Sequence, residues 1–170
     1  MDLSKYRLTV SVAVDASPEA VYDIISDVPR MGEFSPATTS AEWLDDDRSR
    51  FAGTNEMGGN VWTTQCRVDT AERGKEFTFV NLGQKGDAEL VRWSYTFAPA
   101  GDGAEVSEHW QVLPAYLELF AGKMSEEETA AHLDGTVERT RASMEATLAA
   151  LKAAAESCPT PFGACVTCSG

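Results

Sequence analysis

The sequence predicts an α+β fold with a seven-stranded, curved antiparallel sheet, two short helices and a long C-terminal helix. Three observations predict it: apolar residues alternate over 6–14, six strand-like segments follow one another between 38 and 112, and an apolar stripe of helical spacing runs from 126 to 156. The length of 170 residues and a hydrophobic content of 43% suit one domain with one core. We assign residues 1–157 to this domain.

The first elements are a strand and two short helices. Apolar residues at positions 8, 10, 12 and 14 alternate with polar or small ones, which predicts a half-buried strand over 6–14. Ser17 and Pro18 then form a typical helix start, as N-cap and first helical residue. Because prolines at 29 and 36 interrupt and end the helical pattern, we expect helices at about 17–26 and 28–34.

The central part of the chain is a succession of strands separated by turn residues such as glycine, asparagine and aspartate. No helical segment separates these strands, so consecutive strands are expected to pair as hairpins and the sheet to be antiparallel. The predicted strands are at about 40–44, 49–57, 61–71, 75–81, 88–98 and 104–112.

The C-terminal helix is predicted to begin at a capping box, Ser125 to Glu128, and to extend to about residue 156. At 1.5 Å per residue it would be roughly 45 Å long, enough to cross the whole sheet. The apolar segment 113–124 before it contains Pro114 and Gly122. We interpret this segment as a loop or short helix that gates a cavity or, alternatively, as a contact in a homodimer.

Charge and composition exclude several classes of function. The net charge of −13 opposes binding to phosphate backbones and anionic lipids, so nucleic acid is not an expected partner. No apolar run is long enough for membrane insertion, and the N-terminus lacks the pattern of a signal peptide, which predicts a cytoplasmic protein. No cofactor is expected.

Three stretches carry a family resemblance: VAVDASPEAVY at 12–22, VRWSYTF at 91–97 and MEATLAALK at 144–152. Together with the order of elements, they resemble the polyketide cyclase/dehydrase-like branch of the START-like (SRPBCC) superfamily over about residues 5–156. The resemblance implies a helix-grip fold with a ligand cavity. It implies no single activity and no shared catalytic motif, because the superfamily includes carriers, aromatase/cyclases and receptors.

The alternation of side chains along each strand predicts which residues face the cavity, if the apolar face is the inner one. The expected aromatic walls are Trp62, Phe77, Phe79, Trp93, Tyr95 and Trp110, and the expected polar points are Asn55, Thr64, Tyr95 and Glu108. An apolar lining with a few polar groups is typical of a site for a hydrophobic small molecule. The alternative is that the aromatic side chains fill the space as a solid core.

Glu108 and Tyr95 are the candidate catalytic residues. Glu108 shares the inward parity of Val106 and Trp110, and a buried carboxyl acquires a raised pKa suited to acid–base chemistry or to a hydrogen bond with a ligand. A cyclase or dehydrase would use it for proton transfer; a carrier would need only the pocket. The structural alternative is a glutamate that reaches water at a sheet edge or pairs with an inward polar residue.

Four other residues have a structural interpretation. Parity places Arg92 and His109 on the outer face of the sheet. Cys66 lies on the inner face, where a buried cysteine more often packs as a small apolar residue than acts as a nucleophile. For Asn55, a hydrogen bond at the end of a hairpin is an alternative to ligand contact.

The segment 158–170 forms a cysteine-rich tail, which we expect to be flexible. Cys158, Cys165 and Cys168 give only a weak metal-binding pattern, because there is one CxxC and no neighbouring histidine. Compositionally the tail resembles the modified segment of a ribosomally made precursor. The main hypothesis is therefore binding of an aromatic or polyketide-like molecule by a carrier or cyclase/dehydrase-like enzyme. The alternative is a precursor or scaffold whose tail binds metal or is changed by a modifying enzyme.

Overall fold

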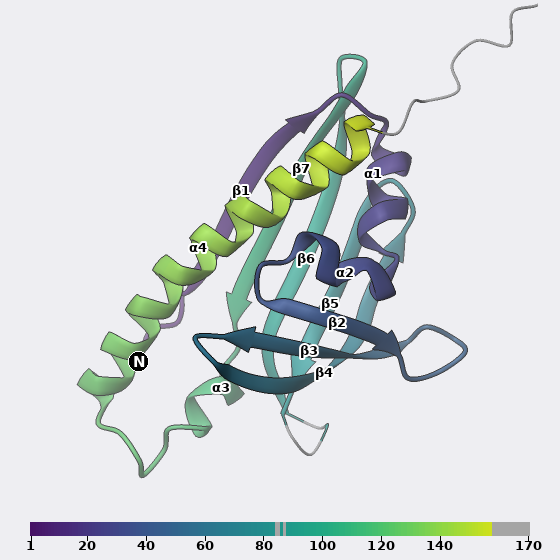
Figure 1. Cartoon of the computed structure of the whole chain (residues 1–170). Coiled ribbons are helices and arrows are strands. Elements are labelled where there is room, and N and C mark those ends of the chain that lie inside the picture. The colour runs from purple at the N-terminus through teal and green to yellow at the C-terminus, as the bar shows by residue number, and fades with distance from the viewer. Residues whose placement is uncertain (84–85, 87, 158–170) are drawn as a thin grey trace, which may run out of the picture.

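The computed structural model describes residues 1–83, 86 and 88–157, and the predictions for the tail lie outside them. One seven-stranded sheet is combined with several helices (Figure 1). In chain order the elements are β1 (Arg7–Val14), α1 (Pro18–Ile25), the 3-10 helix η1 (Val28–Arg30), α2 (Met31–Phe34), β2 (Thr38–Trp43), β3 (Arg50–Met57), β4 (Asn60–Glu72), β5 (Glu76–Leu82), β6 (Glu89–Ala100), β7 (Gly103–Val112), α3 (Ala115–Glu118) and α4 (Glu126–Ser157).

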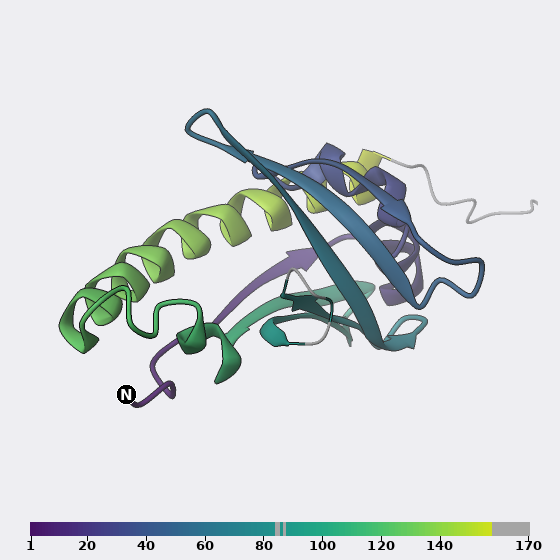
Figure 2. The same cartoon turned by 90° about the horizontal axis from the view of Figure 1, so that it is seen from below.

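The sheet has the strand order β1-β7-β6-β5-β4-β3-β2, and all its pairs are antiparallel. The first and last strands in the chain therefore pair with each other, and hairpins supply the remaining neighbours. Figure 2 shows the strong curvature of the sheet beside the long α4. The predicted α+β helix-grip fold is confirmed. One difference is that the segment predicted as a single helix at 28–34 divides into η1 and α2.

Both predicted helix starts are confirmed in their hydrogen bonds. The Ser17 side chain accepts from the backbone N–H of Ala20 at 3.2 Å, which caps α1. Before α4, the Glu128 N–H donates to Ser125 Oγ at 3.2 Å, and the Ser125 N–H donates to Glu128 Oε2 at 2.8 Å. This reciprocal capping box fixes where α4 begins.

The apolar stripe of α4 closes two hydrophobic clusters on the inner side of the sheet. Leu148 and Leu151 pack in a cluster with α1, α2 and the strands beneath them. Leu133 and Met144 pack with the start of β1 and the end of β7 in a second cluster. Within the described ranges, none of the helices combines the length and apolarity needed to cross a membrane.

Candidate functional site

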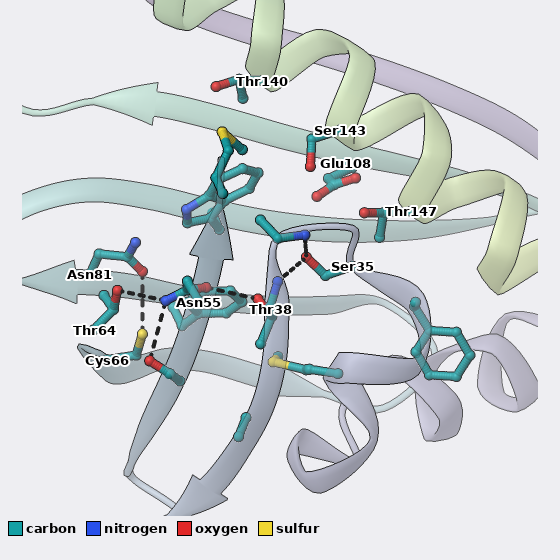
Figure 3. A pocket seen from close by; sticks show the side chains of 18 of the residues that line it. Ser35, Thr38, Asn55, Thr64, Cys66, Asn81, Glu108, Thr140, Ser143 and Thr147 are labelled. Atoms are coloured by element: carbon teal, nitrogen blue, oxygen red, sulfur yellow. Dashed lines mark hydrogen bonds between the residues drawn. The ribbon is translucent and has the colours of Figure 1, made fainter. Parts of the chain in front are cut away.

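A cavity of about 450 Å³ lies between the inner face of the sheet, the α2–β2 segment and α4 (Figure 3). Strands β3 to β7 supply its walls, and one face of α4 covers it. Its volume is within the usual range for small-molecule sites. The cavity is thus large enough for an organic ligand and is not a solid core.

Seven of the nine residues predicted to bind ligand or act in catalysis line this cavity. They are Asn55, Trp62, Thr64, Phe79, Trp93, Tyr95 and Glu108. Phe77 and Trp110 lie elsewhere, which corrects the predicted wall. Phe77 packs edge-on against Tyr22 of α1, and Trp110 belongs to the cluster under the first half of α4. Both side chains point to the inner face of the sheet, but helices pack against them there. Strand alternation alone does not predict where a helix covers the sheet.

Glu108 and Tyr95 form a buried pair at one side of the cavity. They lie opposite each other in the register of β6 and β7, and the Tyr95 hydroxyl donates to Glu108 Oε1 at 2.8 Å. Glu108 is only 2% exposed. Its second oxygen, Oε2, is buried and has no hydrogen-bond partner among the described residues. One oxygen of the carboxyl is therefore held by the protein, and the other has no partner among the described residues.

Burial controls the protonation of this pair. It raises the pKa of Glu108 to about 8, and the hydrogen bond from Tyr95 only partly opposes this effect. Burial, reinforced by the neighbouring carboxyl, also raises the pKa of Tyr95 well above its ordinary value. At neutral pH the Glu108 carboxyl is therefore mainly protonated and can donate a hydrogen bond through its O–H.

Asn55 lines the cavity, but its amide is engaged within the protein. Its Oδ1 accepts from the Thr38 hydroxyl at 3.0 Å, and its Nδ2 donates to the Gly53 carbonyl at 3.2 Å and to Thr64 Oγ1 at 3.1 Å. These bonds connect β2, β3 and β4. The geometry therefore matches the interpretation of Asn55 as a hydrogen-bonding residue of the hairpin, with Thr64 beside it on the cavity surface.

Cys66 and Asn81 add a polar pair that the sequence analysis did not include in the site. The Cys66 thiol donates to Asn81 Oδ1 at 3.2 Å, and both residues line the cavity. Burial raises the pKa of Cys66 to about 12, so the thiol stays protonated and poorly nucleophilic at neutral pH. Asn81 has the same parity as Phe79, a signal that could have identified it.

The helix α4 contributes a polar stripe that the sequence analysis missed. Figure 3 shows Thr140, Ser143 and Thr147 along the α4 side of the cavity, with Ser143 and Thr147 next to Glu108. With His132, Thr136 and Arg139 they recur at helical spacing, next to the apolar stripe. A search for apolar periodicity identifies only the face of the helix that packs on the hydrophobic clusters. The repeat of small hydroxyl residues beside that face was the available signal.

Aromatic side chains also lie toward the outside of the cavity. Trp62 lines it while remaining 44% exposed, which places this ring at its rim. From α3, Tyr116 reaches the lining. The Phe120 ring packs in tilted contacts between Tyr116 and His132, with centroid distances of 5.5 and 5.0 Å. The segment 113–124 thus borders the cavity. Its action as a gate and its role in a homodimer stay predictions.

His109 and Arg92 lie on the outer face, on the side that parity predicts. His109 is half-buried between the hydroxyls of Thr9 and Thr96, each 3.0 Å from a ring nitrogen, and burial lowers its pKa. Arg92 makes an ion pair with Asp69 at 3.5 Å. Neither residue lines the cavity.

The part of the chain that the structure describes contains no cluster of side chains suited to bind a metal ion. No group of three histidine, cysteine or acidic side chains lies close enough there to hold a metal ion. Cys158, Cys165 and Cys168, the cysteines considered for this role, are outside the described residues.

Comparison with solved structures identifies the same fold in other proteins. The Polyketide_cyc-like protein Cgl2372 from Corynebacterium glutamicum is 24% identical, with a TM-score of 0.63 over 86% of this chain and 89% of that one. The di-domain ARO/CYC StfQ of the steffimycin biosynthetic pathway is 14% identical, with a TM-score of 0.65 over 89% of this chain and 50% of StfQ. A START superfamily protein from Mycobacterium smegmatis is 22% identical, with a TM-score of 0.53 over 79% of this chain and 98% of that one.

The family comparison covers nearly the whole described chain. No match was found among curated proteins. Residues 5–156 match the family described as polyketide cyclase / dehydrase and lipid transport, the same range over which the sequence carries its resemblance. The chain therefore belongs to the polyketide cyclase / dehydrase and lipid transport family.

Proposed function

We propose that residues 1–157 bind a hydrophobic, aromatic or polyketide-like small molecule in the cavity and that Glu108 is the main polar group it meets. The observation that carries this proposal is the buried Glu108 carboxyl, which lines a cavity of about 450 Å³ with one oxygen unpartnered among the described residues. Leaving such an oxygen unpaired is costly, and a ligand would satisfy it. The family description and the ARO/CYC function named for StfQ support a polyketide-like ligand.

The chemistry of Glu108 fits ligands that contain a carbonyl group. Its protonated form donates a hydrogen bond to a carbonyl oxygen, while Trp93 and Phe79 offer flat apolar contacts for a ring. A pKa of about 8 keeps the acid and its conjugate base both accessible near neutral pH. This is the property that an acid–base catalyst needs.

As a cyclase/dehydrase-like enzyme, the protein would use Glu108 twice in one elimination. The ionised carboxyl takes a proton from the carbon next to a ligand carbonyl. The resulting acid gives that proton to the hydroxyl group on the neighbouring carbon, which leaves as water while the carbon–carbon double bond forms. Glu108 returns to its ionised state. A carrier would use the same carboxyl only as a hydrogen-bond donor.

Mass spectrometry of small molecules that co-purify with the protein tests the proposal. Wild type is expected to retain an aromatic or polyketide-like compound, and Glu108→Ala and Trp93→Ala are expected to retain less of it. Glu105→Ala is the matched control, because Glu105 is on the same strand but exposed on the outer face. If wild type neither retains a hydrophobic compound nor binds aromatic ketones added to it, the proposal is wrong.

The same experiment separates an enzyme from a carrier. For an enzyme, the retained compound or an added aryl ketone with a hydroxyl group on the β-carbon loses one water mass with time in wild type, and Glu108→Gln abolishes the loss. For a carrier, the mass is unchanged while binding persists.

A further inference from the structure

The wall of the cavity formed by β4 and β5 holds a second polar group, away from Glu108. Asn81 and Thr64 line this wall, and in Figure 3 they lie on the opposite side of the cavity from Glu108, Ser143 and Thr147. None of the hydrogen bonds found for Asn81 in the described structure uses its Nδ2. Among the described residues, the amide nitrogen is therefore a donor without an acceptor at the cavity surface.

Cys66 determines which way the Asn81 amide points. A protonated thiol is a donor, so the atom of Asn81 that faces Sγ at 3.2 Å is the carbonyl oxygen Oδ1. With Oδ1 turned to Cys66, the NH₂ group is directed away from it, as Figure 3 shows. Cys66 is 4% exposed, so its side chain is held in place by the surrounding core. It acts as a positioning residue for Asn81.

Thr64 adds a second donor to this wall. Its Oγ1 accepts from Asn55 Nδ2 at 3.1 Å, so the hydroxyl hydrogen is not used in that bond. In the described structure this hydrogen has no acceptor. Both walls therefore offer donors: the neutral carboxyl of Glu108 on one side, and Asn81 with Thr64 on the other.

The strand register separates the two groups of donors. Glu108 pairs with Tyr95, and Tyr95 pairs with Phe77 on β5. Asn81 is four residues beyond Phe77 on the same strand, roughly 13 Å further along. Between these rows, Trp93 and Phe79 are register partners and line the cavity. A flat apolar stretch thus lies between two polar ends.

We infer that the ligand is elongated and carries a hydrogen-bond-accepting oxygen at each end, one for Glu108 and one for Asn81 and Thr64, with a ring system against Trp93 and Phe79. This inference rests on the proposed binding function and specifies its ligand class. Carbonyl or phenol oxygens at opposite ends of a polycyclic or extended aromatic molecule fit it. A molecule with all its oxygens at one end leaves one set of donors unpaired.

Three rigid probes test the inference by isothermal titration calorimetry: para-phenylphenol, para,para′-biphenol, and the biphenyl isomer that carries both hydroxyls on one ring. Wild type is expected to bind para,para′-biphenol about three- to tenfold more tightly than either other probe, the gain of one hydrogen bond. Asn81→Ala should weaken this preference, because only the Thr64 donor then remains at that end of the cavity, and circular dichroism checks that the variant is folded.

The role of Cys66 is tested by two substitutions. Cys66→Ala removes the donor that orients Asn81 and should reduce the preference for para,para′-biphenol, whereas Cys66→Ser keeps a donor and should restore it. Thr63→Ala, on the exposed outer face of β4, is the control and should behave as wild type. Equal affinity of wild type for the three probes would overturn the second subsite alone, as would a preference that is undiminished in Asn81→Ala. Failure of wild type to bind any probe would overturn the proposed function and the subsite together.

Discussion

The Tyr95 hydroxyl donates to Glu108 Oε1 at 2.8 Å, and this bond divides the two oxygens of a buried carboxyl between the protein and the cavity. The pair spans β6 and β7 directly across the register, so the sheet itself holds its geometry. The carboxyl is costly to ionise because it is buried, and it is oriented because Tyr95 binds one side of it. Both properties can be measured without knowledge of the ligand.

Glu108 is expected to titrate with a pKa of about 8 in the folded protein. Its pKa is about 4.5 when exposed, so ionisation favours the unfolded state and the contribution of Glu108 to stability declines as pH rises from about 4.5 to 8. The full difference is at most about 5 kcal/mol. Carboxyl ¹³C NMR of glutamate-labelled protein gives the pKa, and urea unfolding at several pH values gives the loss. Glu108→Gln should show neither the titration near pH 8 nor the loss of stability between pH 4.5 and 8. A Glu108 signal that titrates near pH 4.5 would show that the raised pKa is wrong.

Tyr95→Phe removes the only hydrogen bond found for Glu108 in the described structure. We expect the free energy of unfolding to fall by about 1–3 kcal/mol, because the buried Oε1 loses its donor. The pKa of Glu108 should rise further, since the bond from Tyr95 lowers it. Urea unfolding and the same NMR titration measure these effects. Tyr22→Phe, a buried tyrosine on α1, is the control and should leave the pKa of Glu108 unchanged.

Gly32→Ala is expected to destabilise the fold, whereas Gly53→Ala is not. A Cβ on Gly32 would lie 2.7 Å from the Thr39 carbonyl oxygen, so α2 would have to move away from β2, at a cost of about 1–3 kcal/mol. A Cβ on Gly53 meets no atom closer than 3.9 Å, and it would point into the cavity. Thermal unfolding should separate the two variants. Equal melting temperatures would show that α2 does not pack this closely.

Cys66 is expected to resist alkylation in the folded protein. Burial removes access to the thiol and raises its pKa to about 12, so little thiolate forms at pH 8. Treatment with iodoacetamide, followed by peptide mapping, should modify Cys66 only after denaturant is added. Rapid modification in native buffer would mean that the cavity wall opens on the timescale of the reaction.

The sequence was sufficient to predict the sheet because its signals are local. Alternation along β7 placed Glu108 inward and His109 outward, and turn residues located the hairpins. The same parity also placed Phe77 and Trp110 inward, but whether an inward ring meets open space or a helix depends on packing between distant segments. The Cys66–Asn81 bond is likewise non-local, since it requires the register of β4 against β5.

The polar face of α4 illustrates the limit of periodicity more clearly. Leu133, Met144 and Leu148 mark a stripe that any amphipathic pattern reveals. Ser143 and Thr147 are each one position before an apolar residue of this stripe. Their spacing as small hydroxyl residues is a weak signal, and the position of the helix over the sheet shows that they border the cavity. For α4, the sequence therefore predicted the apolar residues that pack on the sheet better than the polar residues that line the cavity.

The two adjacent stripes of α4 separate stability from selectivity along a single helix. Leu148 and Leu151 anchor the helix, while Ser143 and Thr147 border the space beside them. Exchange among small residues at positions 143 and 147 would alter the polarity of that space without loosening the anchor. A scaffold arranged in this way can acquire new ligand preferences by mutation while its melting temperature stays nearly constant, a favourable starting point for both divergence and engineering.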